Sequence, residues 1–265
     1  MLKTVIFDMD GVIIDSEAQH AKASLNTFKE LGVDTDLDYC KSFTGSSSKK
    51  MAETAIKDFS LDITTNALLD KLNLAKKKLH EKEGYIPVEG VDALIKRLYK
   101  DGVQLAIASS SSPKEIETVV KKLGIKKYFE KLVSASSVAN PKPSPDTFLL
   151  ALEKLGAAPE NTVIIEDSTF GVKAAKAANV ACIGFINPNS GNQNLNDADV
   201  LIESFDGIDK TFIENTLLRS QGKPLTIAST KRLFIRELAV SDIPDIYPIY
   251  SDPQVKKYID NIDDY

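Results

Sequence analysis

TVIFDMDG, residues 4–11, is the stretch that decides the fold. Its run of β-branched and aromatic residues is typical of a buried strand in a parallel sheet. The run ends at Asp8 and Asp10, followed by Gly11, a residue that tolerates a sharp turn. Ligands of open α/β sheets bind beyond the carboxyl ends of the strands, and paired carboxylates suit a hard cation such as Mg²⁺. The alternative is a strand end followed by an ordinary Asp-Gly turn, and so short a motif does not decide between the two.

Bulk composition narrows the class of protein. A chain of 265 residues can form one large or two modest domains, and 43% hydrophobic with 27% charged residues is typical of a globular protein. A formal net charge of −5 argues against a nucleic-acid ligand but not against a small anionic substrate. Cys40 and Cys182 form neither a disulfide framework nor a zinc site. With no signal-type flank and no long apolar run, we expect a soluble cytoplasmic protein without a membrane partner.

Helical spacing of apolar residues begins after the first strand. This spacing predicts helices over 17–31, 49–59 and 65–83. Ser16 would cap the first helix, and residues 34–39 would form a short polar stretch. The lysines at 76–78 would lie on a solvated face of the third helix. No strand is expected in this segment. We therefore predict an all-helical cap domain over residues 16–83.

From residue 84 the pattern alternates between strands and helices. Strands are expected at 104–108, 132–133, 162–165, 180–185 and 200–202, and helices at 91–100, 113–123, 146–155 and 170–178. Such alternation favours right-handed βαβ crossovers. We predict an α/β fold with a doubly wound, parallel, Rossmann-like sheet formed by residues 1–15 and 84–220, into which the cap is inserted. Residues 221–265 would form a C-terminal extension.

Polar side chains follow several of these strands and loops. In a parallel sheet the carboxyl ends share one edge, so these groups should meet there. They supply carboxylates for a cation, donors for a phosphate at a helix N-terminus, and a lysine in a proline-stiffened loop. The residues are Asp8, Asp10, Ser109, Ser110, Lys142, Glu166 and Asp167. This combination indicates phosphoryl transfer.

The ordered motifs DMDGV, Ser109, PKPSPD around Lys142, and Glu166-Asp167-Ser168 with Gly171 resemble the haloacid dehalogenase superfamily. The resemblance covers about residues 1–206 and is to the capped phosphatases and the β-phosphoglucomutase-like branch. It implies that Asp8 is the nucleophile and Asp10 the general acid and base.

The same resemblance implies further ligands. Mg²⁺ would be held by Asp8, the Asp10 carbonyl and Asp167, with Glu166 beside it, although Glu166-Asp167 could also be a helix cap. The Ser109 hydroxyl and the Ser110 N–H would bind phosphate, and Lys142 would neutralise its charge.

The substrate side departs from the mutase pattern. In that branch, a cap histidine and a Lys-Gly-x-x-Arg-like loop bind a second phosphate. This chain keeps His20 and Gly45 but has Thr44 and Ser48 in place of the lysine and arginine. A hydroxyl cannot replace a guanidinium in binding a second phosphate. Lys49 or Lys50 could supply the missing positive charge.

The C-terminal residues resemble a different family. Residues 233–258 look like the opening strand and helix of an N-acetyltransferase, without a Gly-rich loop for a pyrophosphate. We expect a truncated fusion whose acetyltransferase domain is absent from this chain.

Together these observations predict a Mg²⁺-dependent phosphatase. It would hydrolyse a small phosphorylated metabolite, with a sugar phosphate preferred, through an aspartyl-phosphate on Asp8. The alternatives are a β-phosphoglucomutase-type sugar phosphate mutase and a non-enzymatic module that binds a phosphorylated metabolite.

Overall fold

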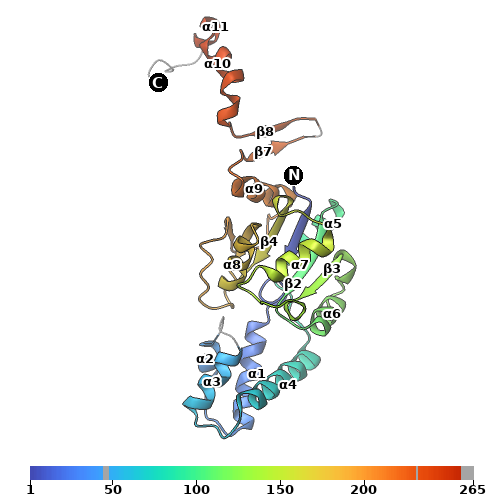
Figure 1. Ribbon diagram of the computed structural model, residues 1–265, viewed down its shortest axis with the longest axis vertical. Coiled ribbons are helices and arrows are strands. Elements are labelled where there is room, and N and C mark those ends of the chain that lie inside the picture. Colours follow the sequence, from blue (N-terminus) through green and yellow to red (C-terminus); the bar gives the residue numbers. More distant parts are fainter. Residues whose placement is uncertain (44–47, 231, 258–265) are drawn as a thin grey trace. The chain divides into compact units, whose positions relative to one another are not determined.

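The computed structural model describes residues 1–43, 48–230 and 232–257 (Figure 1). The chain divides into two compact units, Met1–Leu217 and Leu218–Tyr265. None of the helices in the described ranges is long and apolar enough to cross a membrane.

A six-stranded sheet forms the centre of the first unit (Figure 1), and all its neighbouring strands are parallel. The strands are β1 (Thr4–Phe7), β2 (Gln104–Ser109), β3 (Lys131–Ser134), β4 (Thr162–Glu166), β5 (Ala181–Phe185) and β6 (Val200–Ile202). Their order, β3-β2-β1-β4-β5-β6, reverses direction between β1 and β4. This is the topological switch point where doubly wound sheets bind ligands. The predicted fold class is confirmed.

Helices cover both faces of the sheet. The helices that cover the sheet are α5 (Val91–Lys100), α6 (Pro113–Lys122), α7 (Asp146–Leu155), α8 (Thr169–Ala177) and α9 (Lys210–Ser220). Val5 and Phe7 pack in the cluster that contains α5, α6 and α9, while Ile6 packs with α7 and α8. This alternation is expected for a strand buried on both faces.

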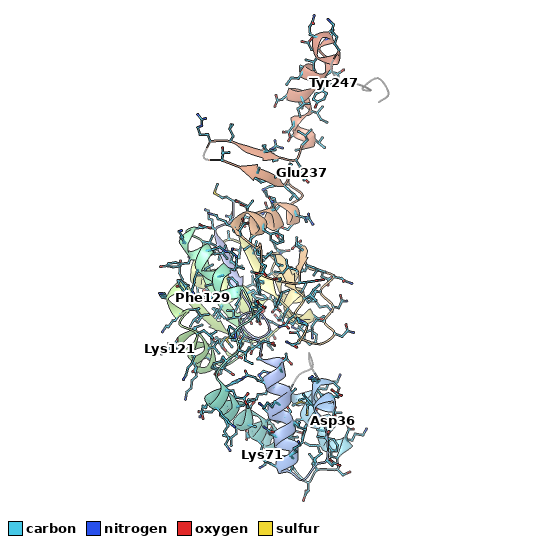
Figure 2. All side chains as sticks on the ribbon, turned by 180° about the vertical axis from the view of Figure 1, so that it is seen from behind. Asp36, Lys71, Lys121, Phe129, Glu237 and Tyr247 are labelled. Atoms are coloured by element: carbon cyan, nitrogen blue, oxygen red, sulfur yellow. The ribbon has the colours of Figure 1, made fainter. Side chains whose placement is uncertain are left out.

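Short 3₁₀ turns complete the connections, at Lys126–Tyr128, Ala135–Ser137 and Pro159–Asn161. Phe129, labelled in Figure 2, ends the first of these turns. Its ring packs edge-on against Phe7, with 6.0 Å between the ring centroids. The turn is therefore tied to the strand that carries the two aspartates.

Four helices lie in the described residues between β1 and α5: α1 (Glu17–Glu30), α2 (Leu37–Lys41), α3 (Ser48–Asp58) and α4 (Thr65–Glu83). They share a hydrophobic cluster of their own around Phe28, Leu68 and Leu72. This helical insertion matches the residues predicted as a cap. The predicted domain boundaries themselves stay a prediction.

Helix α2 corrects the sequence analysis, which predicted a polar stretch at residues 34–39. The Asp36 side chain, labelled in Figure 2, accepts a hydrogen bond from the Tyr39 N–H at 2.9 Å and so caps the helix. Cys40 is buried in the cluster of the insertion, with Tyr39 packed against it. The Asp36 cap and the packing of Tyr39 and Cys40 therefore stabilise this short helix.

The second unit contains the hairpin of β7 (Thr226–Ser229) and β8 (Phe234–Arg236), a 3₁₀ turn (Val240–Asp242), α10 (Ile243–Ser251) and α11 (Pro253–Lys256). Strand β7 was not predicted, since residues 226–229 were assigned only to the C-terminal extension, without a strand there. The Arg236 guanidinium donates two hydrogen bonds of 2.7 Å to the Asp242 carboxylate. Large apolar side chains in this unit are exposed, among them Ile227, Leu233, Ile235, Leu238 and Val240.

Helix α4 provides a matched test of the packing in the insertion. Leu68 is fully buried, whereas Leu74 is 51% exposed. Leu68→Ala should lower the free energy of unfolding of the insertion by about 2–5 kcal/mol, because it leaves a cavity. Leu74→Ala should change it by no more than about 0.5 kcal/mol. Hydrogen exchange of the α4 amides measures both, and equal losses would contradict this assignment of the buried face.

Candidate active site

Lys142 lies at the centre of the carboxylates at the sheet's carboxyl edge. Its ammonium donates hydrogen bonds to Asp8 Oδ1 at 2.5 Å, to Glu166 Oε1 at 2.6 Å and to the Ala108 carbonyl at 3.3 Å. Only 6% of the lysine side chain is exposed. The two carboxylates hold the pKa of Lys142 above its usual range, although burial alone would lower it. The lysine therefore stays charged.

A third carboxylate joins this group. One oxygen atom each from Asp8, Glu166 and Asp167 lies within 4.8 Å of the others, and all three residues are buried. Burial raises the pKa of Asp8 to about 8, and the neighbouring Glu166 and Asp10 add to this effect. Burial, followed by the charges of Glu166 and Asp8, also raises the pKa of Asp167.

Charge counting tests whether this group fits a metal ion. When all three carboxyls are ionised, one ammonium leaves two negative charges uncompensated in a buried site, and the raised pKa values of Asp8 and Asp167 mean that protons relieve this charge where no cation does. A divalent cation with a preference for oxygen ligands supplies the missing charge. The donor set therefore fits Mg²⁺, for which Asp8, Glu166 and Asp167 are the candidate side-chain ligands.

Strand register brings these acids together. Phe7 of β1 is level with Ile165 of β4, so Asp8 and Glu166 follow at the same edge. The Asp8 N–H donates to the Ile165 carbonyl at 2.9 Å, which fixes the chain just after the strand. Glu166 Oε2 accepts three hydrogen bonds of 2.9 Å, from the backbone N–H groups of Asp167 and Ser168 and from the Ser168 hydroxyl.

Two glycines leave room for the carboxylates. A Cβ at Gly171 would overlap the Glu166 carboxylate, and a Cβ at Gly11 would overlap that of Asp167. Gly11 also has a φ of +85°, in the region that favours glycine. Ser168 fills the cap of α8 by accepting from the Gly171 N–H at 3.0 Å, so the acids before it do not serve as the cap.

Serine hydroxyls surround Asp10. Its Oδ1 accepts from the Ser16 hydroxyl at 3.0 Å, and its Oδ2 accepts from Ser111 at 2.8 Å and from Ser109 at 3.4 Å. Ser16 is the N-cap residue of α1, as predicted, but its hydroxyl donates to Asp10 and accepts no capping hydrogen bond from the helix. Ser110 is exposed beside the buried Ser109. Sequence analysis did not single out Ser111.

Lys76 on α4 is a residue that sequence analysis misplaced. Lys77 and Lys78 are exposed, as predicted for a solvated face, but Lys76 is half-buried and interacts with the charges of Glu17, Asp10 and Glu115. Burial lowers the pKa of Lys76. The signal was present in the sequence, since position 76 follows the buried Leu72 by four residues and so lies on the same helix face.

Glu115 on α6 and the two histidines lie in the same region. Burial and the charge of Asp10 raise the pKa of the Glu115 carboxyl, while His20 and Lys76 oppose this shift. The half-buried His20 has its Nδ1 3.8 Å from Glu17, and its ring lies 6.2 Å from that of His80. Groups of the helical insertion and of the sheet's helices therefore share one electrostatic environment around Asp10.

The remaining substrate candidates are not brought to this region by any described contact. Ser48 and Lys49 are exposed at the start of α3, where the Lys49 ammonium lies 3.9 Å from Glu53. Gly45 lies outside the described residues.

The chain is similar in sequence to a known protein family and to named relatives. Residues 5–185 match the haloacid dehalogenase-like hydrolase family. The chain is 31% identical to fructose-1-phosphate phosphatase YqaB of Escherichia coli over 68% of its own length and 94% of the relative's. It is also 31% identical to a phosphorylated carbohydrates phosphatase of Thermotoga maritima, over 77% and 91% of the two chains.

A solved structure is similar as well. CbbY from Rhodobacter sphaeroides, in complex with phosphate, matches with a TM-score of 0.70 and 26% identity, over 81% of this chain and all of that one. The family match ends at residue 185 and so gives no support to the predicted acetyltransferase resemblance of the C-terminal residues.

His80 provides a test of the electrostatics around Asp10. It is 8% exposed, its Nε2 has no hydrogen-bond partner among the described residues, and its ring lies 4.5 Å from that of Tyr85. Burial, followed by the charge of His20, lowers the pKa of His80 below its usual 6.5. In the unfolded chain this group takes up a proton near pH 6.5, so its contribution to stability is complete above that pH and is lost as the pH falls toward the folded pKa.

We therefore expect the wild type to lose more stability between pH 7.5 and 5.5 than His80→Phe does. The difference should have a slope of at most about 1.4 kcal/mol per pH unit. Thermal unfolding across this range measures it. Because the chain has only two histidines, proton NMR can also follow His80 directly, and a titration midpoint above 6.5 would contradict the account.

Proposed function

The chain belongs to the haloacid dehalogenase-like hydrolase family, and we propose that it is a Mg²⁺-dependent phosphatase of a small phosphorylated metabolite, in particular a sugar phosphate. One observation carries the proposal: a buried lysine bridges Asp8 and Glu166 at the switch point of the sheet, with Asp167 completing a cation-binding set. When bound there, Mg²⁺ would neutralise and orient the phosphate.

The first step transfers the phosphoryl group to the enzyme. An Asp8 carboxylate oxygen attacks phosphorus, the bond between phosphorus and the ester oxygen breaks, and an aspartyl-phosphate forms. Asp10 gives a proton to the departing alcohol oxygen. Ser109 and the Ser110 N–H would bind the transferring phosphate, and the Lys142 ammonium offsets its negative charge.

The second step releases phosphate. Asp10, now a carboxylate, takes a proton from a water molecule that attacks phosphorus, and the bond to the Asp8 oxygen breaks. This leaves inorganic phosphate and restores both aspartates. The hydrogen bonds from Ser16 and Ser111 keep the Asp10 side chain directed to one place through both steps.

The substrate class rests on the relatives and on the groups around Asp10. Two relatives carry names of sugar-phosphate phosphatases. His20, Lys76 and Glu115 would surround the alcohol part of the substrate, where Glu115 suits hydroxyl groups better than a second phosphate. We therefore place hydrolysis of a monophosphate above mutase chemistry. A cytoplasmic location stays a prediction.

Phosphate release from a panel of hexose, pentose and polyol phosphates tests the proposal. The wild type should release phosphate only with Mg²⁺, and Asp8→Asn should reduce the rate on the order of 10³-fold or more, because it removes the nucleophile. Asp34→Asn, which removes the same charge from an exposed position, should leave the rate unchanged.

The alternatives predict other outcomes. β-Glucose 1-phosphate is supplied with and without a bisphosphate activator while glucose 6-phosphate is monitored. Conversion with little free phosphate would replace the proposal with the mutase. Phosphate release that survives in Asp8→Asn would contradict the assigned nucleophile, and no turnover of any substrate would favour a binding module.

A further inference from the structure

The loop that follows β5, residues 186–194, contacts three segments of the candidate site. The Asn187 side-chain amide donates to the Gly11 carbonyl at 2.8 Å. The Ser190 hydroxyl donates to Oδ2 of the Asp167 carboxylate. Asn189 donates to the Asp15 carboxylate at 2.6 Å, just before the helical insertion. Sequence analysis assigned no role to this loop.

Ser190 meets Asp167 in a confined place. The exposed fraction is 5% for both residues, and the Asp167 carboxylate also lies so close to Gly11 that a Cβ there would overlap it. The carboxylate is thus held between the Gly11 backbone on one side and the Ser190 hydroxyl on another. Because that hydroxyl has a single proton, its donation to Asp167 uses its whole donor capacity.

The loop itself is held in place by its own hydrogen bonds. The Ser190 N–H donates to the Asn187 carbonyl at 3.1 Å, and the Gln193 side-chain amide donates to the Ser190 carbonyl at 2.9 Å. The Oε1 of Gln193 accepts from the Thr169 N–H at 3.0 Å, at the start of α8. Ser190 is therefore oriented before any ligand arrives, and it is anchored to the helix that follows Asp167.

A hydroxyl so placed changes what Asp167 can do. Without it, a buried carboxylate beside Glu166 and Asp8 would be repelled by both and could rotate away from them. With the Ser190 hydroxyl, the Oδ2 atom of Asp167 is fixed and part of its negative charge is balanced. Because the two oxygens belong to one rigid carboxylate, the direction of Oδ1 is fixed as well. Groups that orient ligating carboxylates in this way typically change metal affinity 10–100-fold.

We propose that Ser190 is a positioning residue that sets the affinity of this site for a divalent cation by orienting Asp167, while Asn187 holds the Gly11 carbonyl. This rests on the proposed function only in taking Asp167 as a cation ligand. The Ser190 hydroxyl is donated to Asp167, so its expected effect is on cation binding and not on the attack at phosphorus.

Calorimetric titration of the full-length chain with Mg²⁺, without substrate, tests this proposal. Ser190→Ala should weaken Mg²⁺ binding about 10–100-fold. Ser190→Thr, which keeps the hydroxyl, should restore most of the affinity. Asn192→Ala, an exposed position in the same loop, should bind Mg²⁺ as the wild type does.

Kinetics add a readout that a merely structural defect would not give. With a substrate from the panel, Ser190→Ala should need about 10–100-fold more Mg²⁺ for half-maximal rate, and saturating Mg²⁺ should recover most of kcat. Should Ser190→Ala fail to fold, Ser190→Cys replaces it, since a thiol keeps the volume but is a weak donor.

The outcomes separate this proposal from the proposed function. Wild-type Mg²⁺ affinity in the folded Ser190→Ala or Ser190→Cys protein would overturn the role of Ser190 and leave the phosphatase proposal standing. A wild type that turns over sugar phosphates but binds no Mg²⁺ would overturn the cation site and Ser190's role together. Loss of kcat that saturating Mg²⁺ does not recover would also overturn the positioning role.

Discussion

The Lys142 ammonium, shared between the carboxylates of Asp8 and Glu166, is the interaction on which the rest of the site depends. Buried carboxylates are costly unless they are paired. When Asp8, Glu166 and Asp167 are all ionised, the ammonium balances one of their negative charges, and a divalent cation would balance the other two in place of the protons that the raised pKa values of Asp8 and Asp167 favour.

The order of the strands brings the three acids together. Strands β1 and β4 are neighbours at the switch point, so their acids emerge side by side without any loop having to reach across the sheet. Gly11 and Gly171 allow the backbone to pass where a side chain would displace a carboxylate. The loop after β5 then closes the arrangement from the side of Asp167. Each element contributes one constraint, and together they orient each acid.

Much of this could be predicted from the sequence, because local patterns carry it. Helix α4 begins at Thr65 and ends at Glu83, as its apolar spacing predicts, and the acids that follow β1 and β4 meet because parallel strands share an edge. Side-chain contacts that depend on how the loops fold back could not be predicted. The hydroxyl of Ser16 is bonded to Asp10 instead of its own helix, and Ser190 lies in a loop without a motif, 23 residues from its partner. Helix α2 and strand β7 are short and depend on tertiary contacts.

The central claim is that Asp8 carries the phosphoryl group during turnover. Enzyme mixed with a sugar phosphate and Mg²⁺ is quenched in acid and treated with borohydride, which reduces an acyl phosphate on aspartate to homoserine. Mass spectrometry of the peptide that contains residue 8 then reads the outcome. The account predicts homoserine at position 8, only with substrate present. Continued phosphate release with an unmodified Asp8 in every quenched sample would contradict it.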